Sequence, residues 1–263
     1  MTEKFSYYDL LAYLVPGTLV VWAAIQLAEA LHILEFVRTG SALLDGSAFV
    51  VVAFLAGHLV QAEAQRWLDA AHKYSVFPSG FPSYSFLVSG QTDEKGKPWC
   101  SDSRRLAYIA AARRHELVSE EQAVALRTLP EKQEELEKAR RTSQEAYRAA
   151  FSFLTDEGRA QKAVTANQTY GLFRGLAMAC TVVTVLFLAI FIVSFIESRL
   201  EGGPSPSFAE LYLYPLLMVA VFAYAAASFR LRARNRGKHH VREVFDAMLS
   251  APPATTGAPN AET

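Results

Sequence analysis

The sequence predicts an all-α membrane protein with four transmembrane helices and a helical cytoplasmic domain inserted between the second and the third. Three observations lead to this fold class. Four long stretches contain no Asp, Glu, Lys or Arg, a polar segment of about 110 residues separates the second stretch from the third, and basic residues are unevenly shared among the connections. Four such stretches in 263 residues make a soluble core of buried helices the weaker interpretation.

The four charge-free stretches have the length that a bilayer requires, which is about 20 mostly apolar residues for about 30 Å of hydrocarbon. They cover residues 10–28, 46–62, 175–196 and 211–229. The third, GLAMACTVVTVLFLAIFIVSFI, is the most apolar. The first is not expected to be a cleavable signal peptide, because it lacks a basic leading region and is preceded by Glu3 and Asp9.

The distribution of Lys and Arg predicts the orientation, since basic residues favour the cytoplasmic side. Residues 63–174 hold 17 basic residues, whereas each short connection holds one, Arg38 or Arg199. A further six follow the fourth stretch: Arg230, Arg232, Arg234, Arg236, Lys238 and Arg242. The formal net charge of zero then divides into 24 basic and 20 acidic residues inside, and 2 basic and 6 acidic residues outside.

The expected organisation therefore alternates across the membrane, with both termini in the cytoplasm. In chain order it comprises a cytoplasmic N-terminus (1–9), a transmembrane helix (10–32), an outer loop (33–45), a second transmembrane helix (46–62), a cytoplasmic helical domain (63–174), a third transmembrane helix (175–198), an outer loop (199–209), a fourth transmembrane helix (210–229), a basic cytoplasmic helix (230–250) and a tail (251–263). The composition of the tail, APPATTGAPNAET, predicts disorder.

The pattern within the cytoplasmic segment is mostly helical. The second span is expected to continue in water as far as His72, and a Pro-, Gly- and Ser-rich loop with a short strand over residues 83–88 follows. Further helices are expected over residues 103–117, from a cap at Ser119 to about Pro130, over residues 131–154, and from a cap at Asp156 into the third span. Spans two and three would thus extend from the membrane as stalks.

No specific catalytic, cofactor or metal motif is present. The sequence lacks G-x-S-x-G, H-E-x-x-H, a Walker A motif and a Gly-rich dinucleotide loop. His239 and His240 are adjacent, so they point about 100° apart on a helix and make a poor chelating pair. Cys100 and Cys180 cannot form a disulfide framework. We therefore expect no enzyme, no cofactor and no metal.

Five residues of the spans are candidates for a pore wall or a gate. His58 and Gln61 lie three residues apart on one helix face, and polar groups at membrane depth usually face a bundle interior or a wet cavity. Thr181 and Thr184 can hydrogen-bond across a helix interface. Pro16 removes a helical hydrogen bond and is a candidate hinge. Ordinary packing within the chain is the alternative for all five.

Small residues recur at helical spacing on the second and fourth spans. They are Ala53, Ala56 and Gly57 on the second and Ala220, Ala223 and Ala227 on the fourth. Such stripes let helices approach closely, within one chain or between copies. Four helices in one chain leave no room for an aqueous path, so a pore would need several copies. We therefore expect a homo-oligomer embedded in the lipid bilayer.

A basic cluster in the cytoplasmic segment is the candidate ligand site. Arg104, Arg105, Arg113 and Arg114 lie on one expected helix, with Tyr108 between them. Guanidinium groups beside an aromatic ring suit phosphate and base recognition, so a nucleotide is a possible ligand. The alternative is a solvated helix whose charges are balanced by the glutamates of the next one. The zero net charge argues against direct binding of duplex nucleic acid.

Three short segments give a resemblance at the level of architecture. They are the start YYDLLAYLVPGTLVV, the end of the second span GHLVQ and the segment NQTYGLFRG that leads into the third span. With the four-span layout, they resemble the membrane effectors of bacterial anti-phage defence systems. The resemblance implies a bacterial inner-membrane protein whose cytoplasmic region senses a signal, often a nucleotide, and whose membrane part disrupts the bilayer or opens a channel.

The leading hypothesis is an oligomeric effector or channel whose cytoplasmic domain binds a ligand or protein partner. The alternative is a non-conducting scaffold or anchor that recruits a cytoplasmic partner through residues 63–174. A transporter or membrane enzyme is a distant third. Transporters often show paired repeats and broken helices, and no such repeat is evident.

Overall fold

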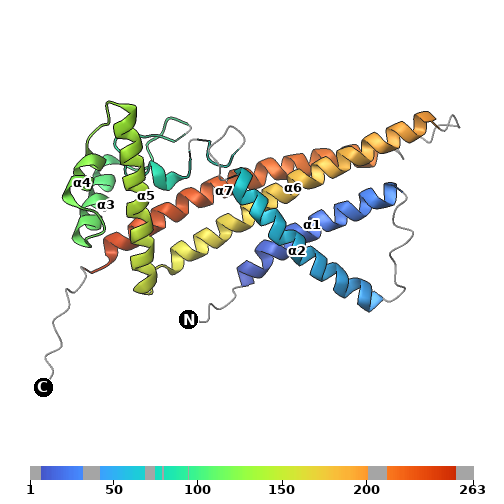
Figure 1. The fold of residues 1–263 in the computed structure, drawn as a ribbon, viewed down its shortest axis with the longest axis horizontal. Helices are drawn as coiled ribbons and strands as arrows, with labels where there is room; N and C mark the ends of the chain where they lie inside the picture. Colours follow the sequence, from blue (N-terminus) through green and yellow to red (C-terminus); the bar gives the residue numbers. More distant parts are fainter. Residues whose placement is uncertain are drawn as a thin grey trace, which may run out of the picture. The chain divides into compact units, whose positions relative to one another are not determined.

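The computed structural model describes residues 7–31, 42–68, 75–78, 80–93, 95–200 and 212–252 (Figure 1). All named elements in these ranges are helices, which agrees with the predicted all-α fold class. In chain order they are α1 (Tyr7–Ala30), α2 (Ala42–Leu68), the short 3-10 helix η2 (Pro82–Tyr84), α3 (Asp102–Arg114), α4 (Glu120–Arg127), α5 (Gln133–Asp156), α6 (Gln161–Leu200) and α7 (Tyr214–Ser250).

Four of these helices are long and apolar enough to cross a membrane, which confirms the four expected candidate spans. The qualifying segments are Leu10–Ala30, Asp45–Leu68, Gln161–Arg199 and Tyr214–Ser250. The last two belong to helices of 40 and 37 residues. At 1.5 Å per residue these helices are about 60 and 55 Å long, so only part of each fits within about 30 Å of hydrocarbon.

The chain divides into two compact units. Unit 1 comprises Met1–Ala70, Tyr74–Val76 and Gln168–Asn235, and unit 2 comprises Ala71–Lys73, Phe77–Asn167 and Arg236–Thr263. Helices α6 and α7 each contribute residues to both units.

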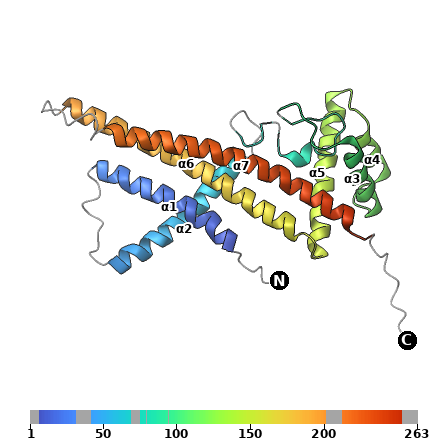
Figure 2. The ribbon, with the colours of Figure 1, turned by 180° about the vertical axis from the view of Figure 1, so that it is seen from behind.

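Aromatic side chains and glycines hold unit 1 together. The ring of Phe187 on α6 is fully buried and lies 5.5 Å from Trp22 on α1 and 6.2 Å from Phe222 on α7. Helix α1 crosses α2, and the apolar parts of α6 and α7 run side by side (Figures 1 and 2). A Cβ atom added at Gly17 would lie 1.7 Å from the carbonyl oxygen of Ala53 on α2. Only glycine therefore permits this crossing.

The core of unit 2 brings together side chains from segments that lie far apart in the sequence. Phe86, from the loop before α3, stacks on Phe245 of α7 with ring centroids 5.4 Å apart, and Tyr108 of α3 lies 5.5 Å from Phe245. Helices α3 and α4 lie beside α5 (Figure 1). Four apolar side chains of α7 are fully buried in this core: Val241, Val244, Phe245 and Met248.

The helix boundaries agree with the sequence at some caps and differ at others. Ser119 caps α4 in a reciprocal capping box with Gln122, as expected. The expected cap at Asp156 is wrong, because Asp156 is the last residue of α5 and Gly158, at φ 69°, follows it. Glycine adopts this left-handed conformation without steric cost, so the chain reverses there and α6 begins at Gln161.

The expected strand over residues 83–88 is also wrong. Pro82 begins the 3-10 helix η2, since its fixed φ favours the first position of a helix. The carbonyl of Ser83 then accepts a 2.6 Å hydrogen bond from the buried Ser143 hydroxyl of α5, which anchors the turn. The expected extension of the second span is described as far as Leu68, and the remainder of it lies outside the described residues.

Candidate functional site

The expected basic cluster on α3 is used for contacts inside unit 2. Arg104 forms a 2.7 Å ion pair with Asp246 of α7, and the hydroxyl of Tyr108 donates a 2.5 Å hydrogen bond to the same carboxylate oxygen. Burial, together with the neighbouring Asp246 carboxylate, raises the pKa of Tyr108. The hydrogen bond from Arg104 to Asp246 raises the pKa of Arg104. These two residues therefore join α3 to α7.

Arg105 is buried and serves the same structural purpose. Its guanidinium donates to the carbonyl oxygens of Leu126 at 2.9 Å and Leu87 at 3.5 Å, and it pairs with Asp102 at 3.2 Å. A buried guanidinium requires such partners, because burying an unpaired charge is costly. Arg105 thus holds the end of α4 and the loop before α3 against α3.

The remaining arginines of the cluster also have protein partners. Arg113 pairs with Glu120 at the start of α4, and Arg114 donates to the carbonyl oxygen of Leu249 at 3.2 Å. The pair with Glu120 matches the alternative in which glutamates of the next helix balance the arginines. The side chains expected to bind phosphate therefore point to several separate protein partners.

Gln61 and His58 have different surroundings, although they lie three residues apart. Gln61 is buried, and its amide nitrogen donates to the carbonyl oxygens of Ala12 on α1 at 2.8 Å and Gly171 on α6 at 3.1 Å. Arg174 donates to the Gln61 amide oxygen at 3.5 Å. Both N–H donors of this amide, and one of the two acceptor positions of its oxygen, are thus used to join α1, α2 and α6.

His58 is exposed on the surface of unit 1. Its ring stacks on Tyr13 of α1 with centroids 4.0 Å apart and meets Phe54 edge-on at 4.7 Å. Among the five span candidates it is the ionisable one, and the stack places it at the α1–α2 crossing.

The other span candidates make local contacts. Thr181 and Thr184 donate to the carbonyls of Ala177 and Cys180, both at 2.8 Å and both one turn back on α6. Their described hydrogen bonds therefore lie within the helix, and the expected bonds across an interface are not among them. Pro16 is buried inside α1, which continues through it.

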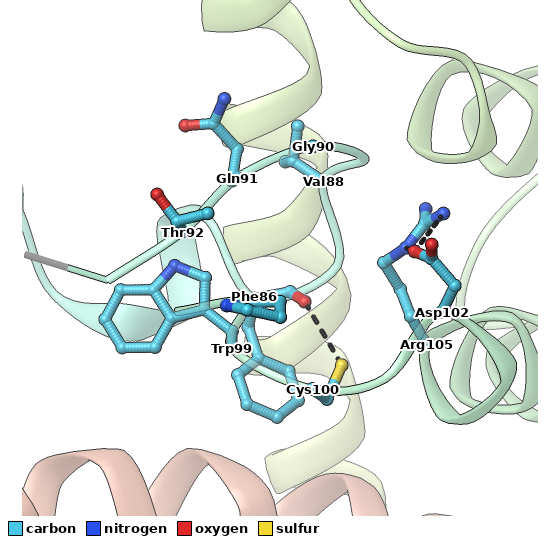
Figure 3. Close-up of a pocket in the computed structure, with 10 residues that line it drawn as sticks. Phe86, Val88, Gly90, Gln91, Thr92, Trp99, Cys100, Asp102 and Arg105 are labelled. Atoms are coloured by element: carbon cyan, nitrogen blue, oxygen red, sulfur yellow. Dashed lines mark hydrogen bonds and ion pairs between the residues drawn. The ribbon is translucent and has the colours of Figure 1, made fainter. Parts of the chain in front are cut away.

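A small pocket in unit 2 is lined mostly by residues that the sequence did not single out, and Arg105 is the candidate residue among them. It has a volume of about 170 Å³ and is lined by the loop before α3 and the first turns of that helix (Figure 3). Phe86, Val88, Pro98 and Trp99 supply apolar walls, and Gln91 supplies an amide. No motif marks this loop, so sequence patterns could not have found the pocket.

Contacts with α7 fix the loop that forms the pocket. Asp93 accepts hydrogen bonds from the backbone of Lys95 and Lys97, which closes a turn, and pairs with Lys238 of α7 at 2.9 Å. The hydrogen bond from Lys238 and those from the turn lower the pKa of Asp93 to about 2. The Lys238 ammonium also lies 5.0 Å from the centre of the Trp99 ring. The pocket is therefore held by charged contacts to α7.

A second polar group is buried where α5, α6 and α7 meet in unit 2. His240 of α7 is fully buried, and its Nδ1 lies 2.8 Å from the carbonyl oxygen of Ala163. Because a carbonyl can only accept, Nδ1 carries the proton, and Nε2 accepts from the hydroxyl of Tyr147. Burial raises the pKa of Tyr147. Both ring nitrogens of His240 are thus used for contacts within unit 2.

In the described part of the chain, no group of three or more His, Cys, Asp or Glu side chains is placed to hold a metal ion. Cys100 is half-buried, and burial raises the pKa of its thiol, which disfavours the nucleophilic thiolate.

Comparisons with known proteins add no family or fold assignment. No protein-family model matches the chain, and no curated protein or solved structure is significantly similar to it.

Proposed function

We propose that this protein is a homo-oligomeric effector of the bacterial inner membrane, with both termini in the cytoplasm. Unit 2 responds to a ligand or a protein partner, and unit 1 perturbs or permeabilises the bilayer. Four helices of membrane-spanning length and composition support the membrane part of the proposal. Anti-phage defence is the setting suggested by the segments YYDLLAYLVPGTLVV, GHLVQ and NQTYGLFRG.

The observation that carries the proposal is the continuity of α6 and α7. Phe222, packed among the apolar helices of unit 1, and Phe245, in the core of unit 2, lie on the same unbroken helix. Helix α6 likewise carries Ala163 of unit 2 and Phe187 of unit 1. An event that changes the packing of such a helix in one unit can bias its packing in the other, provided that the ligand prefers one state.

Two stripes of small residues differ in a way that supports self-association. On α2, Ala53 and Gly57 are buried against α1. On α7, Ala220, Ala223 and Ala227 are exposed along one face of the apolar segment. In a bilayer, small residues on an exposed face permit close contact with another helix. A second copy of the chain is the partner that an oligomeric effector requires.

Dye release from liposomes tests the proposed activity. The full chain, reconstituted in vesicles of anionic and zwitterionic lipids, is expected to release an encapsulated dye or to conduct in planar bilayers. His58→Ala should change the rate of release, whereas Leu59→Ala, at a neighbouring position that is 70% exposed, should not. An oligomeric sample that neither releases dye nor conducts under any condition contradicts the effector proposal. If both variants change the rate equally, His58 does not line the conduction path.

A non-conducting scaffold is the second candidate function. It is favoured by the arginines of α3, which form ion pairs within unit 2. Arg104, Arg105 and Arg113 pair with acidic side chains of unit 2, so the basic cluster offers no ready phosphate site. A scaffold would instead bind a protein partner. It predicts an oligomer or monomer that never conducts but retains one cytoplasmic protein through purification.

A further inference from the structure

Three arginines follow the apolar part of α7 in unit 1, and two of them are used for contacts inside the unit. Arg230 donates to the carbonyl oxygen of Ser75 at 3.0 Å, and Arg234 donates to the carbonyl oxygen of Val76 at 2.8 Å. These two hydrogen bonds hold residues 75 and 76 against α7. The third arginine, Arg232, has no part in them.

Arg232 lies on a different side of the helix from Arg230 and Arg234, because successive residues of an α-helix are about 100° apart. Its side chain is exposed, and its guanidinium carbon lies 5.8 Å from the centre of the Phe173 ring of α6. Among the described residues, Arg232 forms no hydrogen bond or ion pair. All five N–H donors of its guanidinium are therefore open to solvent or to a ligand.

An aromatic pair supports this guanidinium. Phe173 of α6 stacks on Phe229 of α7 with ring centroids 6.0 Å apart, where the two helices run side by side (Figure 2). A cation over an aromatic face is attracted by the ring quadrupole, and an arginine is well suited to this contact because its guanidinium is planar. The contact with Phe173 therefore restrains the charge of Arg232 beside both helices.

The position of Arg232 relative to the apolar stretches matches the headgroup layer of a bilayer. Arg232 lies three residues beyond Phe229, the last residue of the charge-free stretch 211–229, which is about 4.5 Å along the helix axis. The polar layer on each side of the hydrocarbon is about 5–8 Å thick. Phe173 lies two residues before the charge-free stretch 175–196, so α6 reaches the same layer at this end of unit 1.

The charge of α7 in this region is not balanced on the helix itself. From Tyr214 to Arg242, α7 holds six basic residues and no Asp or Glu. A guanidinium can donate two parallel hydrogen bonds to a phosphate, which suits it to a phospholipid headgroup. In a zwitterionic headgroup an attached ammonium competes for that phosphate, whereas an anionic headgroup has no such group. The excess of positive charge therefore favours an anionic lipid.

We propose that Arg232, supported by Phe173 and Phe229, binds the phosphate of an anionic phospholipid headgroup. The proposal rests on the membrane location in the proposed function and adds the class of lipid that unit 1 recognises. Arg230 and Arg234 keep their carbonyl partners and take no part in the site. Because α6 and α7 both contribute to the site, a bound headgroup stabilises their packing in unit 1.

Native mass spectrometry of the full chain in detergent counts bound lipids and tests this site. The probes are phosphatidylglycerol, which is anionic, and phosphatidylcholine, which is zwitterionic, with identical acyl chains. The wild-type chain is expected to bind phosphatidylglycerol about fivefold more tightly than phosphatidylcholine. Arg232→Gln should remove this preference, and Arg232→Lys, which keeps the charge without the planar fork, should retain part of it. Since Arg232 is exposed, both variants should keep the melting temperature of the wild type.

Arg148→Gln is the matched control, because it removes the same charge from an exposed position of α5 in unit 2 and should leave the lipid preference unchanged. Inorganic phosphate in millimolar excess separates a lipid site from a site for free phosphate, and it should not displace phosphatidylglycerol. Displacement by inorganic phosphate overturns the proposal. Equal binding of the two lipids by the wild type, a preference that persists in Arg232→Gln, or an equal loss in Arg148→Gln also overturns it.

Dye release is measured separately on the same proteins. A chain that prefers phosphatidylglycerol through Arg232 but never releases dye retains the lipid site and contradicts the effector function. A chain that releases dye but binds both lipids equally supports the function and contradicts the lipid site.

Discussion

Gln61 donates a hydrogen bond to the carbonyl oxygen of Ala12, the acceptor that Pro16 leaves without its helical donor. Pro16 has no N–H group, so the carbonyl four residues earlier in α1 cannot form the usual bond. The amide nitrogen of Gln61 lies 2.8 Å from that oxygen. A proline in one apolar helix is thus matched by a glutamine in the next, as expected where no water can satisfy the freed carbonyl.

This relationship predicts a double-mutant coupling. Gln61→Leu should destabilise the protein by about 1–2 kcal/mol, because two backbone carbonyls lose a donor. In a Pro16→Ala background the same change should cost less, since residue 16 then supplies an N–H to Ala12. Thermal unfolding of the four proteins in detergent gives the coupling energy. If Gln61→Leu costs the same in both backgrounds, the amide does not compensate for the proline.

Gly175 is expected to be required for the same junction. A Cβ atom added there would lie 2.1 Å from the Gln61 amide nitrogen, so Gly175→Ala should displace the amide and lower the melting temperature. Gly171, one turn earlier on α6, is the matched control, because an added Cβ meets nothing within 4 Å in the described part of the chain. Gly171→Ala should be neutral or stabilising by up to about 1 kcal/mol. Similar losses in both variants would assign the effect to α6 rather than to Gln61.

The crossing of α1 and α2 leaves no room for a side chain at Gly57. Its added Cβ would lie 1.9 Å from the backbone oxygen of Tyr13, which cannot move as a side chain can. Gly57→Ala should therefore separate the two helices and cost about 2 kcal/mol or more. Gly46→Ala, on the same helix but without a described atom within 4 Å, serves as the control. A cysteine pair across the crossing that cross-links equally well in wild type and Gly57→Ala would contradict this prediction.

The sequence was sufficient to predict the apolar helices, because hydrocarbon thickness leaves few alternatives for a charge-free stretch of about 20 residues. It also identified the capping box at Ser119, since both partners lie within one turn. It marked Pro16 and Gln61 separately. The sequence could not show that the Gln61 amide bonds the carbonyl that Pro16 leaves free. Gln61 lies 49 residues from Ala12, and local periodicity does not indicate which helices cross.

The basic cluster shows the same limit. Arg104 and Tyr108 share a carboxylate from Asp246, 142 residues after Arg104. Local sequence shows the nearby acidic residues Asp102 and Glu120, which pair with Arg105 and Arg113, but it gives no sign that Asp246 of α7 meets Arg104. The pocket at Trp99 was not predicted because its residues form no motif. They come together only where Asp93 and Trp99 of the loop contact Lys238 of α7.

His115 should make the stability of unit 2 depend on pH. It is buried beside Phe153, and burial and the charge of Arg114 lower its pKa from 6.5. The unfolded chain therefore takes up a proton before the folded protein does, so the free energy of unfolding is highest above pH 6.5 and falls below it. Chemical unfolding at neutral and mildly acidic pH, for wild type and His115→Gln, measures this contribution. The variant should show the shallower fall, and an equal fall in both would exclude His115 as its source.

The exposed face of α7 gives a test of self-association that does not depend on conductance. Ala223 lies at the middle of the exposed small-residue stripe, so Ala223→Ile adds bulk where two helices would meet and should lower the oligomer fraction severalfold. Val221→Ile is the matched control, because Val221 is also exposed on α7 but the change adds a single methylene. Mass photometry and cross-linking in detergent and in nanodiscs report the distribution. A wild-type chain that is monomeric in both media contradicts the homo-oligomer, and an oligomer unaffected by Ala223→Ile places the contact on another helix.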